Sequence, residues 1–229
     1  MSNRKKLVSI VFSILIFIIA WLAFCGYQWS WGPFVKLHDY KTASLAGNAE
    51  QYALDTIEVE RNSPLKNKNI VFLGSSVTYG ASSMGVSFAD YIGATNDCNI
   101  IKEAVSGTTL VDEGIDSYIS RLKKIDTQNA DIFVCQLSTN DATQKKPLGE
   151  INNSVNINDF DTKTVAGAIE YIIAYAKDKW DCPVVFYTNP KYDSANYQAM
   201  VNLLLEIQKK WNIEIIDMWN DVDFNNITD

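Results

Sequence analysis

Small polar residues follow three apolar segments of this sequence, and their types are those of an acyl-transfer site. The segment "FLGSSVTYG", Phe72 to Gly80, comes directly after the apolar run "NIVFL" and contains two adjacent serines. Gly107 follows "NIIKEA" within "AVSGTT", and Asn140 follows "DIFVCQL" within "STND". A serine hydroxyl can attack a carbonyl carbon, while a glycine N–H and an asparagine amide can stabilise the resulting oxyanion. Each residue alone also suits a turn or a helix cap, so the joint occurrence is what indicates catalysis.

The first of these polar segments does not have the spacing of a phosphate-binding loop. Gly74 and Gly80 are six residues apart, and no lysine follows Gly80 directly. A nucleotide-binding loop would need closely spaced glycines before a helix, or a terminal Gly-Lys-Ser/Thr. A plain turn remains an open alternative, because serine and glycine are ordinary turn residues. The other two polar segments favour nucleophilic catalysis.

Alternating apolar segments predict the elements that position these residues. Five short apolar runs predict strands at 69–73, 99–104, 131–137, 183–188 and 213–217. Apolar residues at helical spacing predict helices within 114–125, 162–180 and 194–211. Because strands and helices alternate, we expect an α/β fold with a parallel five-stranded sheet covered on both faces. Functional residues gather at the carboxyl ends of the strands in such sheets.

The three polar segments resemble the sequence blocks of the SGNH (GDSL-type) hydrolases. Gly74-Ser75-Ser76 matches the first block, Gly-Asp-Ser, with Ser75 in place of the aspartate, so Ser76 corresponds to the nucleophile. Gly107 matches the glycine of the second block. The segment 138–141, Ser-Thr-Asn-Asp, matches the third block, Gly-x-Asn-Asp, with serine in place of glycine. The resemblance extends from about residue 68 to 217.

This resemblance implies a three-layer α/β/α, flavodoxin-like fold and ester hydrolysis through an acyl-serine, without a cofactor. It also implies an oxyanion hole formed by the backbone N–H groups of Ser76 and Gly107 and by the Asn140 side chain. The implied substrate is a small acyl ester, such as an O-acyl group on a surface glycan.

The last block of the family, Asp-x-x-His, has no counterpart in this sequence. The fifth predicted strand ends near Asp217, "MWNDVDFNNITD" follows, and the only histidine is His38. Without a base, a serine hydroxyl is a weak nucleophile at neutral pH, and we expect His38 to be a surface residue. The chain is then either an active hydrolase cut before the motif, which we expect, or a non-catalytic module that binds acyl or carbohydrate groups.

The N-terminal residues predict a membrane anchor. Leu7 to Tyr27 contains no charged residue, and its 21 residues would span about 31 Å as a helix, enough for a bilayer core. Arg4, Lys5 and Lys6 precede it, which places the N-terminus in the cytoplasm and the rest outside. A cleaved signal peptide is the alternative, but "AWLAFCG" lacks the small residues of a cleavage site.

Charge and cysteine content exclude several other functions. The chain has a net charge of −7, and without its three N-terminal cations the remainder carries about −10, so nucleic acid is not an expected partner. Four scattered cysteines with one histidine predict neither a disulfide scaffold nor a zinc site.

Three regions follow from these patterns. Residues 1–27 are predicted to form the cytoplasmic tip and single-pass anchor, 28–66 a connecting region with a helix within 40–60, and 67–229 an extracytoplasmic hydrolase-like domain that is incomplete at its C-terminus. The polar loop 142–160 follows Asn140, and its Lys145 and Lys146 are predicted to influence substrate preference.

Overall fold

The computed structural model describes residues 3–226, which form two compact units. The first unit contains the residues up to Thr56 together with Ser82–Gly85. The second contains Ile57–Ala81 and the residues from Val86 onward. All the candidate site residues belong to the second unit, so their arrangement can be described within that unit alone.

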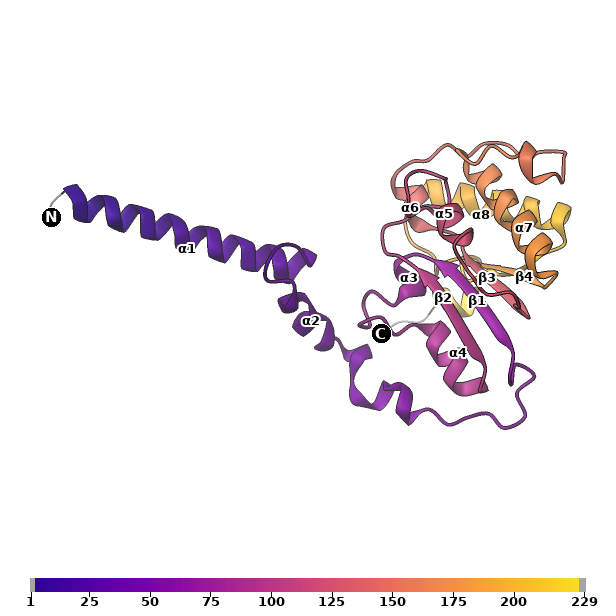
Figure 1. Ribbon diagram of the computed structural model, residues 1–229, viewed down its shortest axis with the longest axis horizontal. Coiled ribbons are helices and arrows are strands. Elements are labelled where there is room, and N and C mark those ends of the chain that lie inside the picture. Colours follow the sequence, from indigo (N-terminus) through magenta and orange to yellow (C-terminus); the bar gives the residue numbers. More distant parts are fainter. Residues whose placement is uncertain (1–2, 227–229) are drawn as a thin grey trace. The chain divides into compact units, whose positions relative to one another are not determined.

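The second unit is built on a parallel sheet of five strands in the order β2-β1-β3-β4-β5 (Figure 1). Each neighbouring pair of strands is parallel. The α/β class and the parallel five-stranded sheet predicted from the sequence are therefore confirmed. The strands are β1 (Asn69–Gly74), β2 (Asn99–Ala104), β3 (Ile132–Gln136), β4 (Val184–Tyr187) and β5 (Glu214–Ile216).

Helices lie on both faces of this sheet (Figure 1). The helices α5 (Tyr118–Leu122), α7 (Val165–Trp180) and α8 (Ala195–Trp211) share the larger apolar core with one face of the sheet. On the other face, α4 (Phe88–Asn96) packs against side chains of β1. The short helices are α3 (Ser76–Tyr79), α6 (Thr139–Thr143) and α9 (Val222–Asn225), with a 3₁₀ turn at Ile157–Asp159.

The longer helices begin at polar residues that satisfy free backbone N–H groups. Thr164 caps α7 by accepting a hydrogen bond from Gly167 N at 3.2 Å, and Ser194 caps α8 in the same way. Ser87 and Asp90 form a capping box at the start of α4. This Ser-x-x-Asp pattern was a sequence signal for α4, which the apolar spacing alone did not identify.

The face of the sheet that carries α4 is only partly covered. An open apolar groove of about 590 Å³ runs beside α4. The prediction of a sheet covered on both faces is therefore confirmed for the face of α5, α7 and α8 and incomplete for this one. The groove is lined by Phe72, Val134 and Val185 of the strands, Phe88 and Ile92 of α4, and Met218 and Phe224, among other apolar residues.

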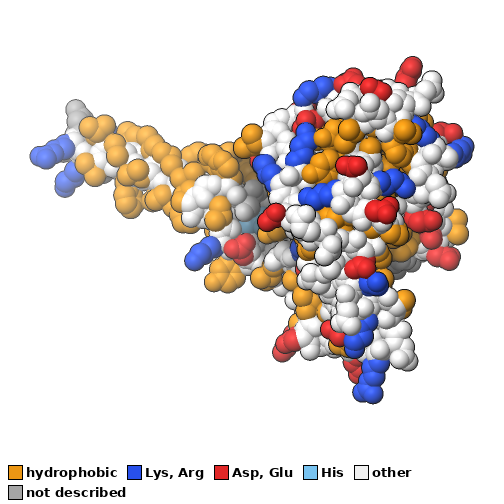
Figure 2. Space-filling model, turned by 45° about the vertical axis from the view of Figure 1, so that its right-hand side comes forward, with side chains coloured by type: hydrophobic (Ala, Val, Ile, Leu, Met, Phe, Trp, Pro, Cys, Tyr) orange, Lys and Arg blue, Asp and Glu red, His pale blue; other side chains and the backbone are white. Residues whose placement is uncertain are grey.

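The first unit begins with the long apolar helix α1 (Asn3–Trp29), followed by α2 (Lys36–Ala43). Within Arg4–Trp29, the most apolar stretch of 18 residues has a mean hydropathy of 2.9, so this helix is long and apolar enough to cross a membrane. Figure 2 shows its hydrophobic side chains exposed along its length. A signal sequence has the same properties.

The prediction of a helix within 40–60 is wrong for most of that range. Three 3₁₀ turns occur there instead, at Ala46–Asn48, Glu50–Tyr52 and Leu54–Thr56. None of their residues is buried. Without an apolar face to bury, a short segment gains too little to form an α-helix.

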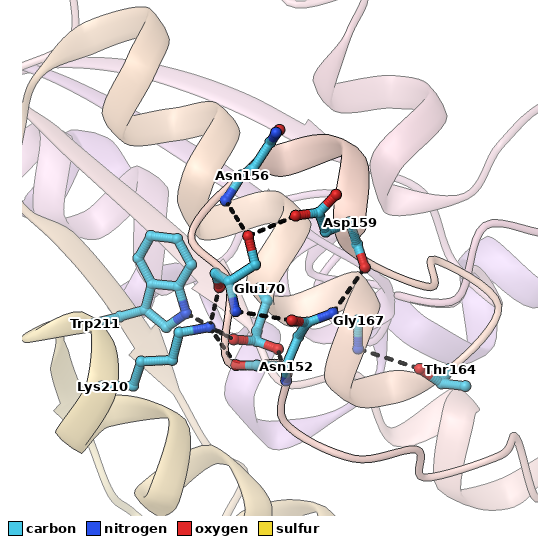
Figure 3. A network of polar contacts seen from close by, with 9 residues as sticks. Asn152, Asn156, Asp159, Thr164, Gly167, Glu170, Lys210 and Trp211 are labelled. Atoms are coloured by element: carbon cyan, nitrogen blue, oxygen red, sulfur yellow. Dashed lines mark hydrogen bonds and ion pairs between the residues drawn. The ribbon is translucent and has the colours of Figure 1, made fainter.

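A buried glutamate fastens the polar segment between α6 and α7 to the two long helices (Figure 3). Glu170 of α7 is fully buried, and its carboxylate accepts hydrogen bonds from Asn152 N at 2.8 Å and Trp211 Nε1 at 3.0 Å. It also forms an ion pair with Lys210 of α8. The Lys210 ammonium donates to the carbonyl oxygens of Asn152 and Ser154, at 2.6 and 2.5 Å. We call these residues the Glu170–Lys210 cluster.

Candidate active site

The order of the strands brings the predicted site residues to neighbouring strand ends. β1 lies between β2 and β3, and Gly74 at the end of β1 pairs with Ala104 at the end of β2. Ser76, Gly107 and Asn140 follow the carboxyl ends of β1, β2 and β3. Because the strand order reverses at β1, a crevice at this edge is where an open α/β sheet binds ligands.

Ser75 and Ser76 have different surroundings. Ser75 is fully buried, and its N–H and hydroxyl both donate to Gln136 Oε1, at 2.9 and 3.2 Å. Ser76 is the first residue of α3 and is partly exposed. Its hydroxyl makes no hydrogen bond to any described residue. Ser75 therefore makes only internal loop contacts, whereas the Ser76 hydroxyl is free of hydrogen bonds to the described residues, as a nucleophile requires.

Gln136, which the sequence reasoning did not identify, closes the turn between β1 and α3. Its Oε1 also accepts a hydrogen bond from Thr78 Oγ1 at 2.9 Å, and the Thr78 hydroxyl lies 2.6 Å from the Tyr187 hydroxyl. A Cβ atom on Gly74 would lie 1.6 Å from Thr78 Oγ1, so only glycine permits this close approach. A polar side chain within the apolar run "DIFVCQL" was the available signal, since a buried amide needs partners.

The Asn140 side chain is held against the loop that follows β2. Its Nδ2 donates to the Thr108 carbonyl at 2.9 Å, and Ser138 Oγ donates to the same carbonyl at 3.2 Å. Because an amide carries two N–H donors, one remains unused by the described residues. Gly107 precedes Thr108 with a φ of +82° and is exposed. The exposed Gly107 backbone therefore belongs to the same loop that the Asn140 amide contacts, and that amide keeps one N–H that no described residue accepts.

Asp141 joins the β2 loop to α6. Its buried carboxylate accepts hydrogen bonds from the N–H groups of Leu110 and Val111, at 2.8 and 3.1 Å. Burial raises the pKa of this carboxyl, while the hydrogen bonds from Val111 and Leu110 oppose the shift. Both oxygens are occupied, so Asp141 stabilises the arrangement of the two loops and is poorly placed to accept a proton from Ser76.

A buried arginine connects the β1 turn to the β2 loop. Arg121 of α5 is only 3% exposed, and its guanidinium donates to the carbonyl of Gly74 at 2.8 Å and to Thr108 Oγ1 at 3.0 Å. It also donates to the carbonyl of Glu103 at the end of β2, at 2.9 Å. The sequence reasoning used the segment 114–125 only for its apolar stripe and so missed this residue. The sequence signal that could have identified Arg121 was a cation next to the apolar stripe of a helix.

The second unit contains no imidazole, because the single histidine of the sequence, His38, belongs to the first unit. There its Nδ1 lies 3.3 Å from Thr42 Oγ1. After β5, Asp217 accepts hydrogen bonds from Thr188 Oγ1 at 3.2 Å and from the Asn220 side-chain amide at 2.7 Å. Within the described residues, Asp217 thus orients an asparagine, which cannot serve as a base.

A hollow of about 170 Å³ adjoins the β2 loop. Its lining includes Gly107 and Thr108 of that loop, together with Glu113, Gln144 and Lys146. Lys146 forms an ion pair with Glu113. The first residues of the loop 142–160 therefore reach a hollow that contains a predicted site residue.

We expect Lys146→Ala to shift substrate preference away from anionic esters and towards cationic ones, because the Glu113 carboxylate would lose its partner. The effect on kcat/KM should be roughly tenfold or less, since a half-exposed ion pair contributes about 1 kcal/mol or less. The measurement compares kcat/KM for a matched anionic, neutral and cationic ester. Lys145, which the sequence also predicted to influence substrate preference, is exposed and does not line the hollow, so we now expect no such effect and use Lys145→Ala as the control. Equal losses on all three esters would contradict this prediction.

No protein-family model and no curated protein sequence matches this chain. Solved structures do resemble it. A protein from Lactobacillus plantarum is 18% identical with a TM-score of 0.59, and the match covers 68% of this chain and 79% of that one. A protein from Bacteroides ovatus named as a GDSL-like lipase is 20% identical with a TM-score of 0.53, covering 68% and 86%. A protein from Chitinophaga pinensis named as a lipase is 18% identical with a TM-score of 0.53, covering 69% and 70%.

These similarities concern the fold, because the identities are low. The second unit has the α/β fold of the SGNH (GDSL-type) hydrolases, which the three sequence blocks predicted. The neighbours' names indicate lipases and say nothing of which residues of this chain act. Any role for Ser76, Gly107 and Asn140 must therefore be inferred from the contacts and chemistry of these residues in this chain.

Proposed function

We propose that this protein is a membrane-anchored, extracytoplasmic serine esterase that acts on a small acyl ester or an O-acylated glycan. The main support is the partly exposed Ser76 hydroxyl, which has no partner among residues 3–226 and lies on a tight strand-to-helix turn flanked by the loops of Gly107 and Asn140. The SGNH hydrolase fold adds weight to this reading. Arg4, Lys5 and Lys6 in the first turn of α1 favour an extracytoplasmic second unit.

In the proposed reaction, Ser76 Oγ attacks the ester carbonyl carbon. The backbone N–H groups of Ser76 and Gly107 and the free Asn140 N–H stabilise the oxyanion. The carbon–oxygen bond to the alcohol then breaks, the alcohol takes up a proton, and an acyl-serine remains for water to hydrolyse. Because the second unit has no imidazole, the Ser76 proton passes to solvent, and we expect slow turnover by this chain.

The experiment that tests this function looks for the acyl-serine directly. The full-length protein in detergent is incubated with an activated short-chain aryl ester and digested, and its peptides are examined by mass spectrometry. We expect an acyl group on the peptide that contains Ser76. Labelling scattered over surface lysines and serines, with none on this peptide, would refute the esterase proposal.

A non-catalytic module that binds acyl or carbohydrate groups is the second candidate function. The absence of histidine from the second unit favours it. Such a module would bind an unreactive amide analogue of the ester as tightly as the ester itself. It would also leave Ser76 unmodified after long incubation, so the same labelling experiment separates the two functions.

We expect the full-length protein to remain with membranes after washing with high salt and with alkali. A helix that spans the bilayer is held by burial of about 20 apolar residues, which neither treatment reverses. A chain that begins at Ser30 should be soluble. The measurement is the distribution of protein between pellet and supernatant, and release of the full-length chain by alkali would rule out the spanning helix.

A further inference from the structure

The chain turns back sharply where α1 ends. Ser30 adopts the left-handed conformation with a φ of +53°, and its N–H donates to the carbonyl of Gly26 at 3.1 Å. A Cβ atom on Gly26 would lie 2.5 Å from the carbonyl oxygen of Phe34, so glycine is required for this contact. Cys25 is buried at the same place. Residues 25–43 therefore form a hairpin with the end of α1.

Side-chain contacts hold α2 against the last turns of α1. The Lys41 ammonium donates to Gln28 Oε1 at 2.6 Å and lies 5.3 Å from the centre of the Tyr27 ring. Thr42 is buried. Because α2 is fixed in this way, its position in a membrane determines the position of the α1 turns that it covers.

The charges of α2 set the depth of the hairpin. Lys36, Asp39 and Lys41 lie on this helix, and charged side chains are strongly disfavoured in the hydrocarbon core. The α1 turns from Cys25 onward must then lie outside that core. The remaining apolar segment, from Leu7 to Phe24, would measure about 27 Å as a helix, close to the thickness of roughly 30 Å that it must cross.

The exposed side chains of the hairpin are those that favour the membrane–water interface. Trp29, Trp31 and Tyr40 are 63%, 62% and 75% exposed, and Lys36 and Lys41 supply cations nearby in the same hairpin. Amphipathic rings and basic side chains together favour the headgroup layer. We propose that the hairpin 25–43 and the loop Ser82–Gly85 form a platform that lies in the lipid headgroup layer.

The loop belongs to this platform through two contacts within the first unit. Asn48 Nδ2 donates to the carbonyl oxygens of Thr42 and Ser82, at 2.6 and 2.8 Å. Met84, which is 61% exposed, lines a hollow of about 280 Å³ with residues of α2, including Tyr40. An exposed methionine next to an exposed tyrosine extends the apolar surface of the hairpin towards lipid.

The platform indicates the class of substrate, and this step rests on the proposed esterase function. Ser82 is six residues beyond Ser76, and a chain of that length reaches at most about 20 Å when fully extended. The nucleophile is therefore confined near the membrane surface. Its substrate is an ester carried by a membrane-embedded molecule, either a lipid or a lipid-linked glycan.

Photo-crosslinking tests the platform independently of any enzymatic activity. Full-length protein carrying a photoreactive residue at position 40, or separately at position 84, is placed in vesicles of phosphatidylcholine and phosphatidylglycerol. We expect lipid adducts at both positions. Gly26→Ala should lower them severalfold by forcing Phe34 away, whereas Gly47→Ala should not, because nothing lies within 4 Å of a Cβ at Gly47. The absence of lipid adducts in the unaltered hairpin would overturn the proposal.

A second measurement tests the substrate class. Two esters with the same reacting groups, one soluble and one attached to a phospholipid in the vesicle, are compared for the rate at which they acylate Ser76. Confinement to the same surface should favour the lipid-borne ester by about tenfold or more. Equal rates would overturn the inference about the substrate. Lipid adducts at 40 and 84 without acylation by either ester would support the platform and refute the esterase proposal.

Discussion

Ser76→Ala will abolish the covalent acyl adduct that an activated aryl ester forms with this protein, whereas Ser75→Ala will leave it in place. The Ser76 hydroxyl has no partner among the described residues, while Ser75 is buried against Gln136. Loss of the Ser75 hydroxyl removes one buried hydrogen bond, worth about 1 kcal/mol, and leaves the Ser75 N–H bond to Gln136 intact. The measurement is the fraction of each variant modified on the peptide that contains position 76.

Asn140→Ala should slow formation of the same adduct by about 10²- to 10³-fold, the usual effect of removing one oxyanion donor. The adduct is a better measurement than turnover, because a site without its catalytic groups can retain about 10³-fold catalysis over water through binding and oxyanion stabilisation. Turnover could therefore persist in Ser76→Ala, but a covalent intermediate could not. An undiminished adduct in Ser76→Ala would show that another residue is the nucleophile.

The sheet could be predicted from the sequence because its strands read as short apolar runs, of which β1, β3 and β4 are largely buried. All five runs became strands, and the structure places β1 between β2 and β3. Ser76, Gly107 and Asn140 could be placed at strand ends for the same reason. Their roles depend on distances between loops, which periodicity does not determine.

The residues that the sequence reasoning missed are buried polar groups whose partners are distant in the chain. Gln136 bonds to Ser75, which is 61 positions away, and Arg121 bonds to Gly74, 47 positions away. Each side chain looks out of place in an apolar segment, but its partner becomes known only when the strands are side by side. The hairpin 25–43 was missed for another reason. It depends on a close contact between Gly26 and the Phe34 backbone, and the spacing of apolar residues does not reveal such a contact.

Glu170→Ala should lower the free energy of unfolding of the second unit by about 3–5 kcal/mol, the cost of removing one partner from a buried ion pair. The substitution would leave the Lys210 ammonium and the N–H groups of Trp211 and Asn152 without their acceptor (Figure 3). Glu170→Gln should cost less, because the amide oxygen can still accept one of these hydrogen bonds. The measurement is urea unfolding followed by tryptophan fluorescence.

The double variant Glu170→Leu with Lys210→Met separates the charge from the packing. With both charges gone, no buried ion remains unpaired, and replacement of such a pair by apolar side chains is often neutral or stabilising. We therefore expect the double variant to be more stable than Glu170→Ala, although Asn152 and Trp211 would still lack an acceptor. Hydrogen exchange at the Asn152 amide should nevertheless speed up in both, since its N–H loses the Glu170 carboxylate as acceptor in either variant. A double variant as unstable as Glu170→Ala, with unchanged exchange in this segment, would show that the cluster stabilises the helices without fastening the loop.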